Sequence, residues 1–149
     1  MSADIFVDTN VLVYAYDRSE PIKQAIAVTV LASIVRSGAG VISAQVLSEF
    51  FNAVTRKIPA PLTLEEAHAR VQNLLRLLHV VPVTDLIVLE AVRGVREHQL
   101  SLWDAQIWAA ARLNQIPVIL SEDFRGDLVL EGIRVVDPFR PDFKLEEWI

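Results

Sequence analysis

The amino-acid sequence predicts a three-layer α/β/α fold, in which a parallel sheet lies between two layers of helices. Short β-branched runs alternate with longer helical patterns along the whole chain. The short runs are apolar at every position, which is typical of strands that helices cover on both faces. Parallel strands that alternate with helices are joined by right-handed crossovers, and the result is a layered sandwich.

Five short segments have the composition of buried strands. Turn-forming residues precede several of them: Gly40 precedes the second segment, Asn114 the fourth and Gly132 the fifth. In chain order, the expected strands cover residues 5–7, 41–42, 80–83, 117–120 and 133–136. Ligands of such sheets bind near the carboxyl ends of the strands, so we expect the functional residues at that edge.

Five longer segments have helical periodicity and recognisable ends. Pro21 favours the first turn of a helix, and Gly38 stops that helix. Thr63 and Glu66 have the spacing of a capping box. The expected helices cover residues 21–37, a segment from Ser43 through Val54, residues 63–78, a segment from Leu86 to about Glu97 capped by Asp85, and a segment that begins at Ser101 or Leu102 and ends at Leu113, with Asn114 as C-cap.

The composition indicates one ordinary domain. The chain has 149 residues, which fits a single domain over 1–149, with a core over about 4–136 and a C-terminal tail over 137–149. Hydrophobic residues make up 52% of the chain and exclude an intrinsically disordered protein. Cysteine is absent, which excludes disulfides, thiolate metal sites and cysteine nucleophiles. The net charge of −5 disfavours binding to nucleic acid through overall charge alone.

The sequence also bears on the compartment. No apolar run reaches the ~18 residues that a membrane-spanning helix needs. The first residues lack the basic stretch that opens a signal peptide. We therefore expect a cytoplasmic protein without a membrane partner.

Four acidic residues are expected near the carboxyl edge of the sheet. Asp8 follows the first strand, Asp123 follows the fourth, and Asp104 lies in the first turn of the last helix. Glu49 lies about two turns into the helix after the second strand, and its longer side chain can lean back towards this edge. Each acid alone has an ordinary explanation as a cap or turn residue. Their joint placement is more specific and predicts a shared pocket.

Carboxylates packed together repel one another and do not all ionise unless a cation neutralises them. Hard divalent cations prefer oxygen ligands, whereas a zinc site would use cysteine or clustered histidine, which the chain lacks. The predicted pocket therefore suits one or two Mg²⁺ ions, with Mn²⁺ able to substitute. Such ions activate water and stabilise the charge that develops when a phosphodiester is cleaved.

At these residues the chain resembles the PIN-domain ribonucleases, specifically the VapC-type toxins of bacterial and archaeal type II toxin–antitoxin systems. The segments that carry the resemblance are 5–15, 43–50, 101–107 and 119–124. The resemblance implies a parallel five-stranded sheet flanked by helices, and an RNA substrate. It also implies that the protein forms a homodimer and that a cognate antitoxin protein silences it.

The resemblance assigns roles to individual residues. Asp8, Glu49 and Asp104 match the three acids that hold the catalytic metal in that family. Asp123 matches a more variable fourth acid, although Glu122 or Asp127 could take its place. Supporting polar positions are matched by Thr9, Asn10 and Ser121.

The sequence thus predicts a Mg²⁺-dependent endoribonuclease, the toxin of a toxin–antitoxin pair, whose products carry a 5′-phosphate and a 3′-hydroxyl. Two alternatives remain open at this point. One is an α/β phosphatase with Asp8 as a covalent nucleophile, but no second acid follows two residues later. The other is a non-catalytic module that binds RNA or protein, which the cost of an unneutralised acidic cluster disfavours.

Other residues have a functional and a structural interpretation. Trp103 could stack on a nucleobase, but packing against its neighbours is the favoured interpretation. A basic cluster of Arg93, Arg96 and His98 could bind phosphates, but a solvated helix face is favoured.

Two apolar features are also ambiguous. A stripe on the 63–78 helix could form a groove with the 21–37 helix for an antitoxin segment. The aromatic residues of the tail could pack on the domain or on a second subunit; they are Phe139, Phe143 and Trp148.

Overall fold

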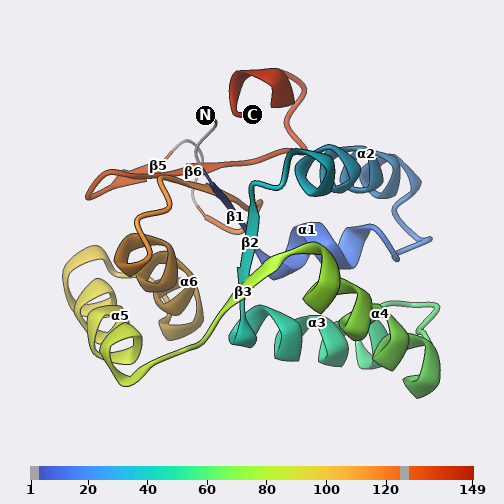
Figure 1. Cartoon of the computed structure of the whole chain (residues 1–149), viewed down its shortest axis with the longest axis horizontal. Helices are drawn as coiled ribbons and strands as arrows, with labels where there is room; N and C mark the ends of the chain where they lie inside the picture. The colour runs from blue at the N-terminus through green and yellow to red at the C-terminus, as the bar shows by residue number, and fades with distance from the viewer. Residues whose placement is uncertain (1–3, 125–127) are drawn as a thin grey trace.

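Figure 1 shows the computed structural model of the chain, which describes residues 4–124 and 128–149. Within these residues the strands are β1 (Ile5–Val7), β2 (Gly40–Ser43), β3 (His79–Val81), β4 (Val118–Leu120), β5 (Leu128–Leu130) and β6 (Ile133–Val136). They form one sheet in the order β3-β2-β1-β4-β6-β5. Strands β1 to β4 and β6 are mutually parallel, as predicted, whereas β5 is antiparallel to β6.

The five expected parallel strands are thus confirmed. The expected number of strands is wrong, because β5 adds a sixth, antiparallel strand at the edge of the sheet. The connection between β5 and β6 consists of Glu131 and Gly132, which have φ angles of 50° and 85°. Two successive residues with positive φ form the type I′ turn that suits the twist of a hairpin. Glycine adopts this conformation without strain, but glutamate is an unusual residue there, so the hairpin was not expected.

The helices described are α1 (Thr9–Tyr14), α2 (Pro21–Ser37), α3 (Ala44–Arg56), α4 (Leu64–Leu77), α5 (Asp85–His98), α6 (Leu102–Leu113) and the 3₁₀ helix η1 (Leu145–Glu147). All five predicted helices are present. Gly38 ends α2 with a φ of 74°, and Thr63 and Glu66 form the predicted capping box. The predicted cap of α5 is wrong by one residue, because the Thr84 hydroxyl accepts a hydrogen bond from the Ile87 amide and Asp85 is already helical.

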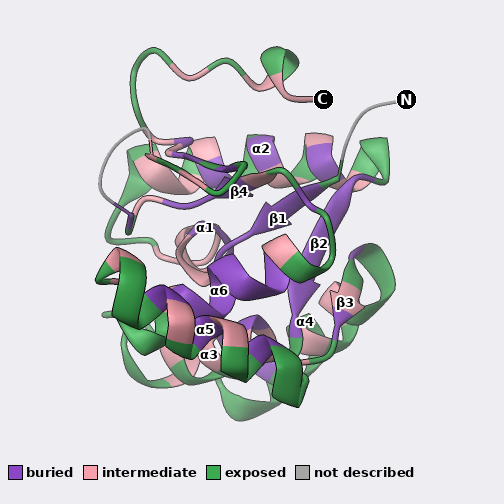
Figure 2. Ribbon diagram, turned by 90° about the vertical axis from the view of Figure 1, so that its left-hand side faces the viewer, coloured by how far each residue is buried: buried purple, intermediate pink, exposed green. Residues whose placement is uncertain are grey.

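The sheet and α6 form the centre of the core (Figure 2). In both views α2 lies on one side of the sheet, and α5 and α6 lie on the other. Every residue of α6 from 105 to 111 is buried, including the Trp108 side chain. A fully buried aromatic side chain anchors the helix to the sheet, so the first turn of α6 is held rigidly beside the strand ends.

The structure places the two apolar features that the sequence left ambiguous, the tail and α4. Phe139, Phe143 and Trp148 pack against the core of the same chain. The hollow beside α4 is bounded by α3, with Phe51 and Val71 among its walls. The groove expected between α4 and α2 (Pro21–Ser37) for an antitoxin segment stays a prediction. In residues 4–124 and 128–149, no helix has both the length and the apolar character to cross a membrane.

Candidate metal centre

Three of the four predicted acids meet at the carboxyl edge of the sheet. Carboxylate oxygens of Asp8, Asp104 and Asp123 all lie within 4.8 Å of one another. Asp8 follows β1 directly and Asp123 follows β4 by two residues, while Asp104 lies in the first turn of α6. Because β1 and β4 are parallel neighbours in which Val7 pairs with Leu120, both strands end at the same level. Strand pairing therefore brings together residues that are more than a hundred positions apart.

Asp8 is the most enclosed of the three, with only 4% of its surface exposed. Its Oδ1 accepts a 2.7 Å hydrogen bond from the Thr9 amide, and its Oδ2 accepts one of 2.7 Å from the Ser121 hydroxyl. Burial, with smaller contributions from the charges of Asp123 and Asp104, raises the pKa of Asp8 to about 7, although these hydrogen bonds oppose the shift. Above neutral pH, a buried anion therefore lies next to two further carboxylates.

Asp104 and Asp123 extend the cluster towards solvent. Asp104 is half-buried, and its amide donates a 3.1 Å hydrogen bond to the Ser101 hydroxyl that caps α6. Burial raises the pKa of Asp104, and the charges of Asp123 and Glu49 act in the same direction. A hollow of about 250 Å³ opens beside both carboxylates. The cluster is thus buried on the sheet side and accessible from the other.

Asn10 connects the two loops that carry the acids. Its Nδ2 donates to the Ser121 hydroxyl and to Asp123 Oδ2, both at 3.1 Å, and to Asp8 Oδ2 at 3.3 Å. Its Oδ1 accepts a 3.2 Å hydrogen bond from the Glu122 amide. Asn10 and Ser121, both predicted from the sequence as supporting residues, therefore contact the carboxylates through hydrogen bonds. They hold the side chains of Asp8 and Asp123 in fixed orientations.

Glu49 lies beside this trio rather than in it. Its Oε1 accepts hydrogen bonds from Gln45 Nε2 at 3.0 Å and from the Thr9 hydroxyl at 3.3 Å. Glu49 is half-buried, although its neighbours in the sequence are apolar. The reason is that α3 is amphipathic: Phe50 is fully buried, whereas Phe51 faces outwards.

Glu122 and Asp127 were the alternatives to Asp123. The Glu122 carboxylate is bound by Lys23 Nζ at 2.8 Å and by the Tyr14 hydroxyl, which draws it towards α1 and α2. Asp127 lies outside the described residues. Asp123 is therefore the fourth-motif acid that the structure brings next to Asp8.

The donor set fits a hard divalent cation. It consists only of carboxylate oxygens, which Mg²⁺ and Mn²⁺ prefer. Asp8 is a buried anion above neutral pH, and no described cationic side chain forms an ion pair with it. A bound cation would compensate the repulsion among the three carboxylates and lower the pKa of Asp8.

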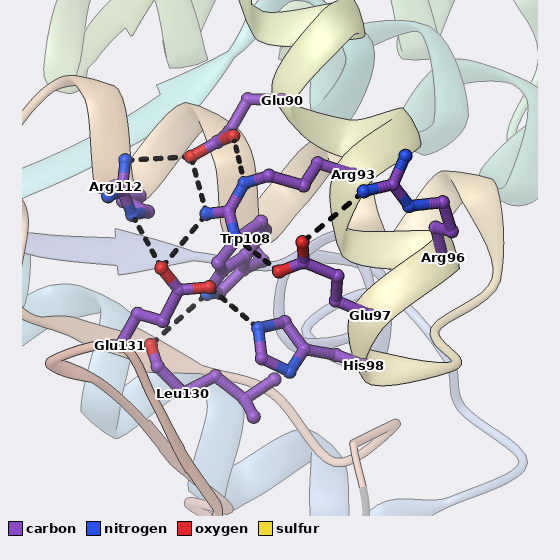
Figure 3. A network of polar contacts seen from close by, with 9 residues as sticks. All are labelled: Glu90, Arg93, Arg96, Glu97, His98, Trp108, Arg112, Leu130 and Glu131. Atoms are coloured by element: carbon purple, nitrogen blue, oxygen red, sulfur yellow. Dashed lines mark hydrogen bonds and ion pairs between the residues drawn. The ribbon is translucent and has the colours of Figure 1, made fainter.

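The basic cluster on α5 has a structural role (Figure 3). Arg93 donates hydrogen bonds to Glu90, Glu97 and Glu131, and His98 Nε2 lies 2.7 Å from Glu131. Glu97, His98 and Glu131 also lie close enough together to hold a metal ion, but Arg93 already neutralises these acids. The interpretation as a fully solvated helix face is therefore wrong for Arg93 and His98, which join α5 to the β5–β6 turn.

The prediction that Trp103 packs against its neighbours is wrong, because 60% of its surface is exposed. Sequence reasoning also missed two glutamines close to it. Gln45 Nε2 donates to Glu49 and to the Trp103 carbonyl, and Gln45 Oε1 accepts a 2.9 Å hydrogen bond from Gln106 Nε2. A signal was present, since Gln106 is the only polar residue in the apolar stretch from Ala105 to Ala111.

Comparison with known proteins relates this geometry to a family. The family model described as PIN domain matches residues 5–132. No curated protein matches the chain by sequence.

Several solved structures share the fold. A VapC toxin of Mycobacterium tuberculosis that cleaves the sarcin-ricin loop is 21% identical, with a TM-score of 0.64 over 80% of this chain and 92% of that one. A toxin–antitoxin complex from Klebsiella pneumoniae is 21% identical, with a TM-score of 0.62 over 91% and 98% of the two chains. A DNA-bound VapBC from Salmonella typhimurium is 17% identical, with a TM-score of 0.64 over 91% and 98%.

The match over residues 5–132 covers the sheet from β1 to β5 and all four predicted acids, Asp8, Glu49, Asp104 and Asp123. The family match and the shared fold are two separate comparisons, and they agree. This chain belongs to the PIN-domain family.

Proposed function

We propose that this protein is a divalent-metal-dependent endoribonuclease, and that it acts as the toxin of a toxin–antitoxin pair in the cytoplasm. The observation that carries the proposal is the convergence of Asp8, Asp104 and Asp123, with carboxylate oxygens within 4.8 Å of one another in a protein of the PIN-domain family. Mg²⁺ is the expected cation, and Mn²⁺ should replace it because both prefer carboxylate oxygens.

The side chains around the cluster have distinct tasks in this proposal. Asp8, Asp104 and Asp123 would hold the cation, and Glu49 would lie at its edge. When bound, the cation supplies an activated water and positive charge for the phosphoryl oxygens. Asn10 and Ser121 keep the carboxylates oriented through their hydrogen bonds. The expected products carry a 5′-phosphate and a 3′-hydroxyl.

The partners follow from the relatives. A toxin–antitoxin complex among the similar structures supports an antitoxin protein as the partner of this chain. We also propose a homodimer. Sedimentation of the purified protein tests the dimer, and co-purification with the product of a neighbouring gene tests the antitoxin.

The decisive experiment measures cleavage of RNA with Mg²⁺, with Mn²⁺ and with EDTA. We expect cleavage with either cation and none with EDTA, and no cleavage by Asp8→Asn or Asp104→Asn. Leu89→Ala is a matched control, since Leu89 is exposed on α5 and has no role in the site. Metal-independent cleavage that survives both aspartate substitutions would contradict the proposal.

The same preparations separate the two alternatives. A phosphoryl group trapped on Asp8 would indicate the phosphatase. Calorimetry with Mn²⁺ tests the non-catalytic module: the absence of binding, or binding that Glu49→Ala leaves unchanged together with the absence of cleavage, would favour it.

A further inference from the structure

A second hollow, of about 560 Å³, opens beside the metal centre. Glu49 forms part of its wall, so the hollow is continuous with the edge of the carboxylate cluster. Trp103, the residue that precedes Asp104, forms another wall. A ligand in this hollow would therefore lie next to a group bound at the cluster.

Trp103 has a large aromatic side chain that is exposed, although its backbone lies in a well-anchored helix. It lies in the first turn of α6, whose N-terminus is capped by Ser101, and its carbonyl accepts a 3.2 Å hydrogen bond from Gln45 Nε2. Trp103 has 60% of its surface exposed, whereas Trp108 is fully buried. An exposed aromatic ring on a rigid element is a suitable platform for a nucleobase, because every base has a π-face.

Gln106 provides an acceptor in the same hollow. It is only 9% exposed, and its Nε2 donates to Gln45 Oε1. Its Oε1 has no hydrogen-bond partner among residues 4–124 and 128–149. Within those residues no buried side-chain oxygen lacks a partner, so this oxygen is open to the hollow and can accept a hydrogen bond from a ligand there. The amino and imino groups on the edges of nucleobases are such donors.

Lys57 provides the positive charge. It lines the hollow just after the last turn of α3, and within the described residues it has no acidic partner. Positive charge is scarce on this acidic chain, so a lysine without an acidic partner in the wall of this hollow favours a phosphate as its partner. An aromatic face, an amide acceptor and a cation are together the groups that recognise a nucleotide.

We propose that this hollow binds a nucleotide of single-stranded RNA adjacent to the scissile phosphodiester. Its base stacks on Trp103 with its edge towards Gln106, and a neighbouring phosphate lies against Lys57. This inference rests on the proposed ribonuclease function and adds where the substrate binds and why it is single-stranded. A base paired in a duplex cannot present its face to Trp103, so double-stranded RNA is excluded from the hollow.

The test uses full-length protein carrying Asp8→Asn, which keeps the RNA intact, and a fluorescein-labelled single-stranded RNA of about eight nucleotides of mixed sequence. Anisotropy measures its dissociation constant. We expect Trp103→Ala to weaken binding about tenfold, and Trp103→Phe to stay within about threefold because the ring is kept. Lys57→Met should weaken binding and reduce its salt dependence, since one phosphate contact is lost. Leu89→Ala should have no effect.

Two further measurements keep the outcomes distinct. Mn²⁺ affinity of Trp103→Ala with Asp8 intact should equal that of the wild type, which shows that Asp104 is undisturbed. If the Asp8→Asn protein binds no RNA at all, the proposed function fails. If it binds RNA and Trp103→Ala binds equally well, only the nucleotide subsite is overturned. Subunit dissociation or loss of antitoxin binding by Trp103→Ala, with RNA affinity unchanged, would assign the surface to a protein partner and also overturn it.

Discussion

The ammonium group of Lys23 lies 2.8 Å from the carboxylate of Glu122, the residue that immediately precedes Asp123. The Tyr14 hydroxyl donates to the other oxygen of Glu122, and Lys23 also lies 4.8 Å from the centre of the Tyr14 ring. Phe139 of the tail packs edge-on against that ring. These contacts hold Glu122 on one side of its loop, and Asp123 is left facing the other acids.

This arrangement predicts different effects for two adjacent acids. Asp123→Asn should weaken Mn²⁺ binding by tenfold or more, because it removes a carboxylate from the cluster. Glu122→Gln should change the affinity by less than about threefold, because its carboxylate is already bound by Lys23 and is not a ligand. Isothermal titration with Mn²⁺ measures both. An equal loss in the two variants would contradict the assignment of Asp123.

Asn10 should control metal affinity without touching the ion. Its amide orients Asp123 and the Ser121 hydroxyl, so Asn10→Ala should lower the affinity for Mn²⁺ by about 10–100-fold. Asn10→Asp is the informative second variant. It keeps the size and adds a fourth negative charge, but it loses the donor to Asp123. If Asn10→Ala binds Mn²⁺ as tightly as the wild type, the supporting role assigned to Asn10 is wrong.

The sequence predicted the positions of the acids because each lies at the end of an element that is easy to recognise. Asp8 follows a continuous apolar run, and Asp104 follows a serine cap. The acids come together because strand pairing sets Val7 opposite Leu120, and no local sequence pattern encodes that pairing. Glu49 was harder to place, because helical spacing does not tell how far a side chain about two turns into a helix leans back towards the sheet edge.

Other features could not be predicted for physical reasons. The β5–β6 turn has glutamate where its positive φ favours asparagine or glycine, so the local signal is weak. Helix α1 has only six residues, too few for a periodic pattern. Trp103 was expected to pack because aromatic residues usually do, and residue type alone does not distinguish a buried ring from an exposed platform.

The pH dependence of metal binding should report on Asp8. Its pKa in the metal-free protein is about 7, and a ligand carboxylate must be ionised. We therefore expect Mn²⁺ affinity to fall by up to about tenfold per unit as the pH drops below 7, and to level off above it. Calorimetry in two buffers of different ionisation enthalpy should detect release of about half a proton at pH 7. Absence of proton release would contradict the raised pKa.

The raised pKa of Asp8 also makes the stability of the metal-free protein depend on pH. Stability falls as the pH rises, whereas metal affinity increases. Asp8 titrates at about 7 in the folded protein and at 3.8 as a model group, so the folded state binds the proton more tightly. Its contribution to stability is therefore full below pH ~4 and is lost as the pH rises through 7. Asp8→Asn removes the buried charge and should stabilise the metal-free protein at pH 8 by about 1–2 kcal/mol. Urea unfolding in EDTA at pH 5 and pH 8 measures it, and the gain should be smaller at pH 5.

The network around Arg93 predicts a loss of stability without a loss of activity. Arg93 bonds Glu90, Glu97 and Glu131, and its guanidinium lies 5.5 Å from the Trp108 ring. Arg93→Met keeps much of the aliphatic packing but leaves these acids without their common partner. The groups are partly exposed and screened by solvent, so we expect a modest but measurable loss in the free energy of unfolding.

Arg96→Met is the matched control, because the Arg96 side chain is 80% exposed and only its contact of 3.6 Å with Glu97 would be lost. It should change stability by less than about 0.5 kcal/mol. The loss in Arg93→Met should also shrink at low pH. Arg93 and His98 lower the pKa of Glu131 to about 2, so the ion pair stabilises the fold above pH ~4.5 and is lost as the pH falls through 2. RNA cleavage should be equal in both variants. A selective fall in RNA affinity with Arg93→Met would instead revive the interpretation of this cluster as a phosphate-binding surface.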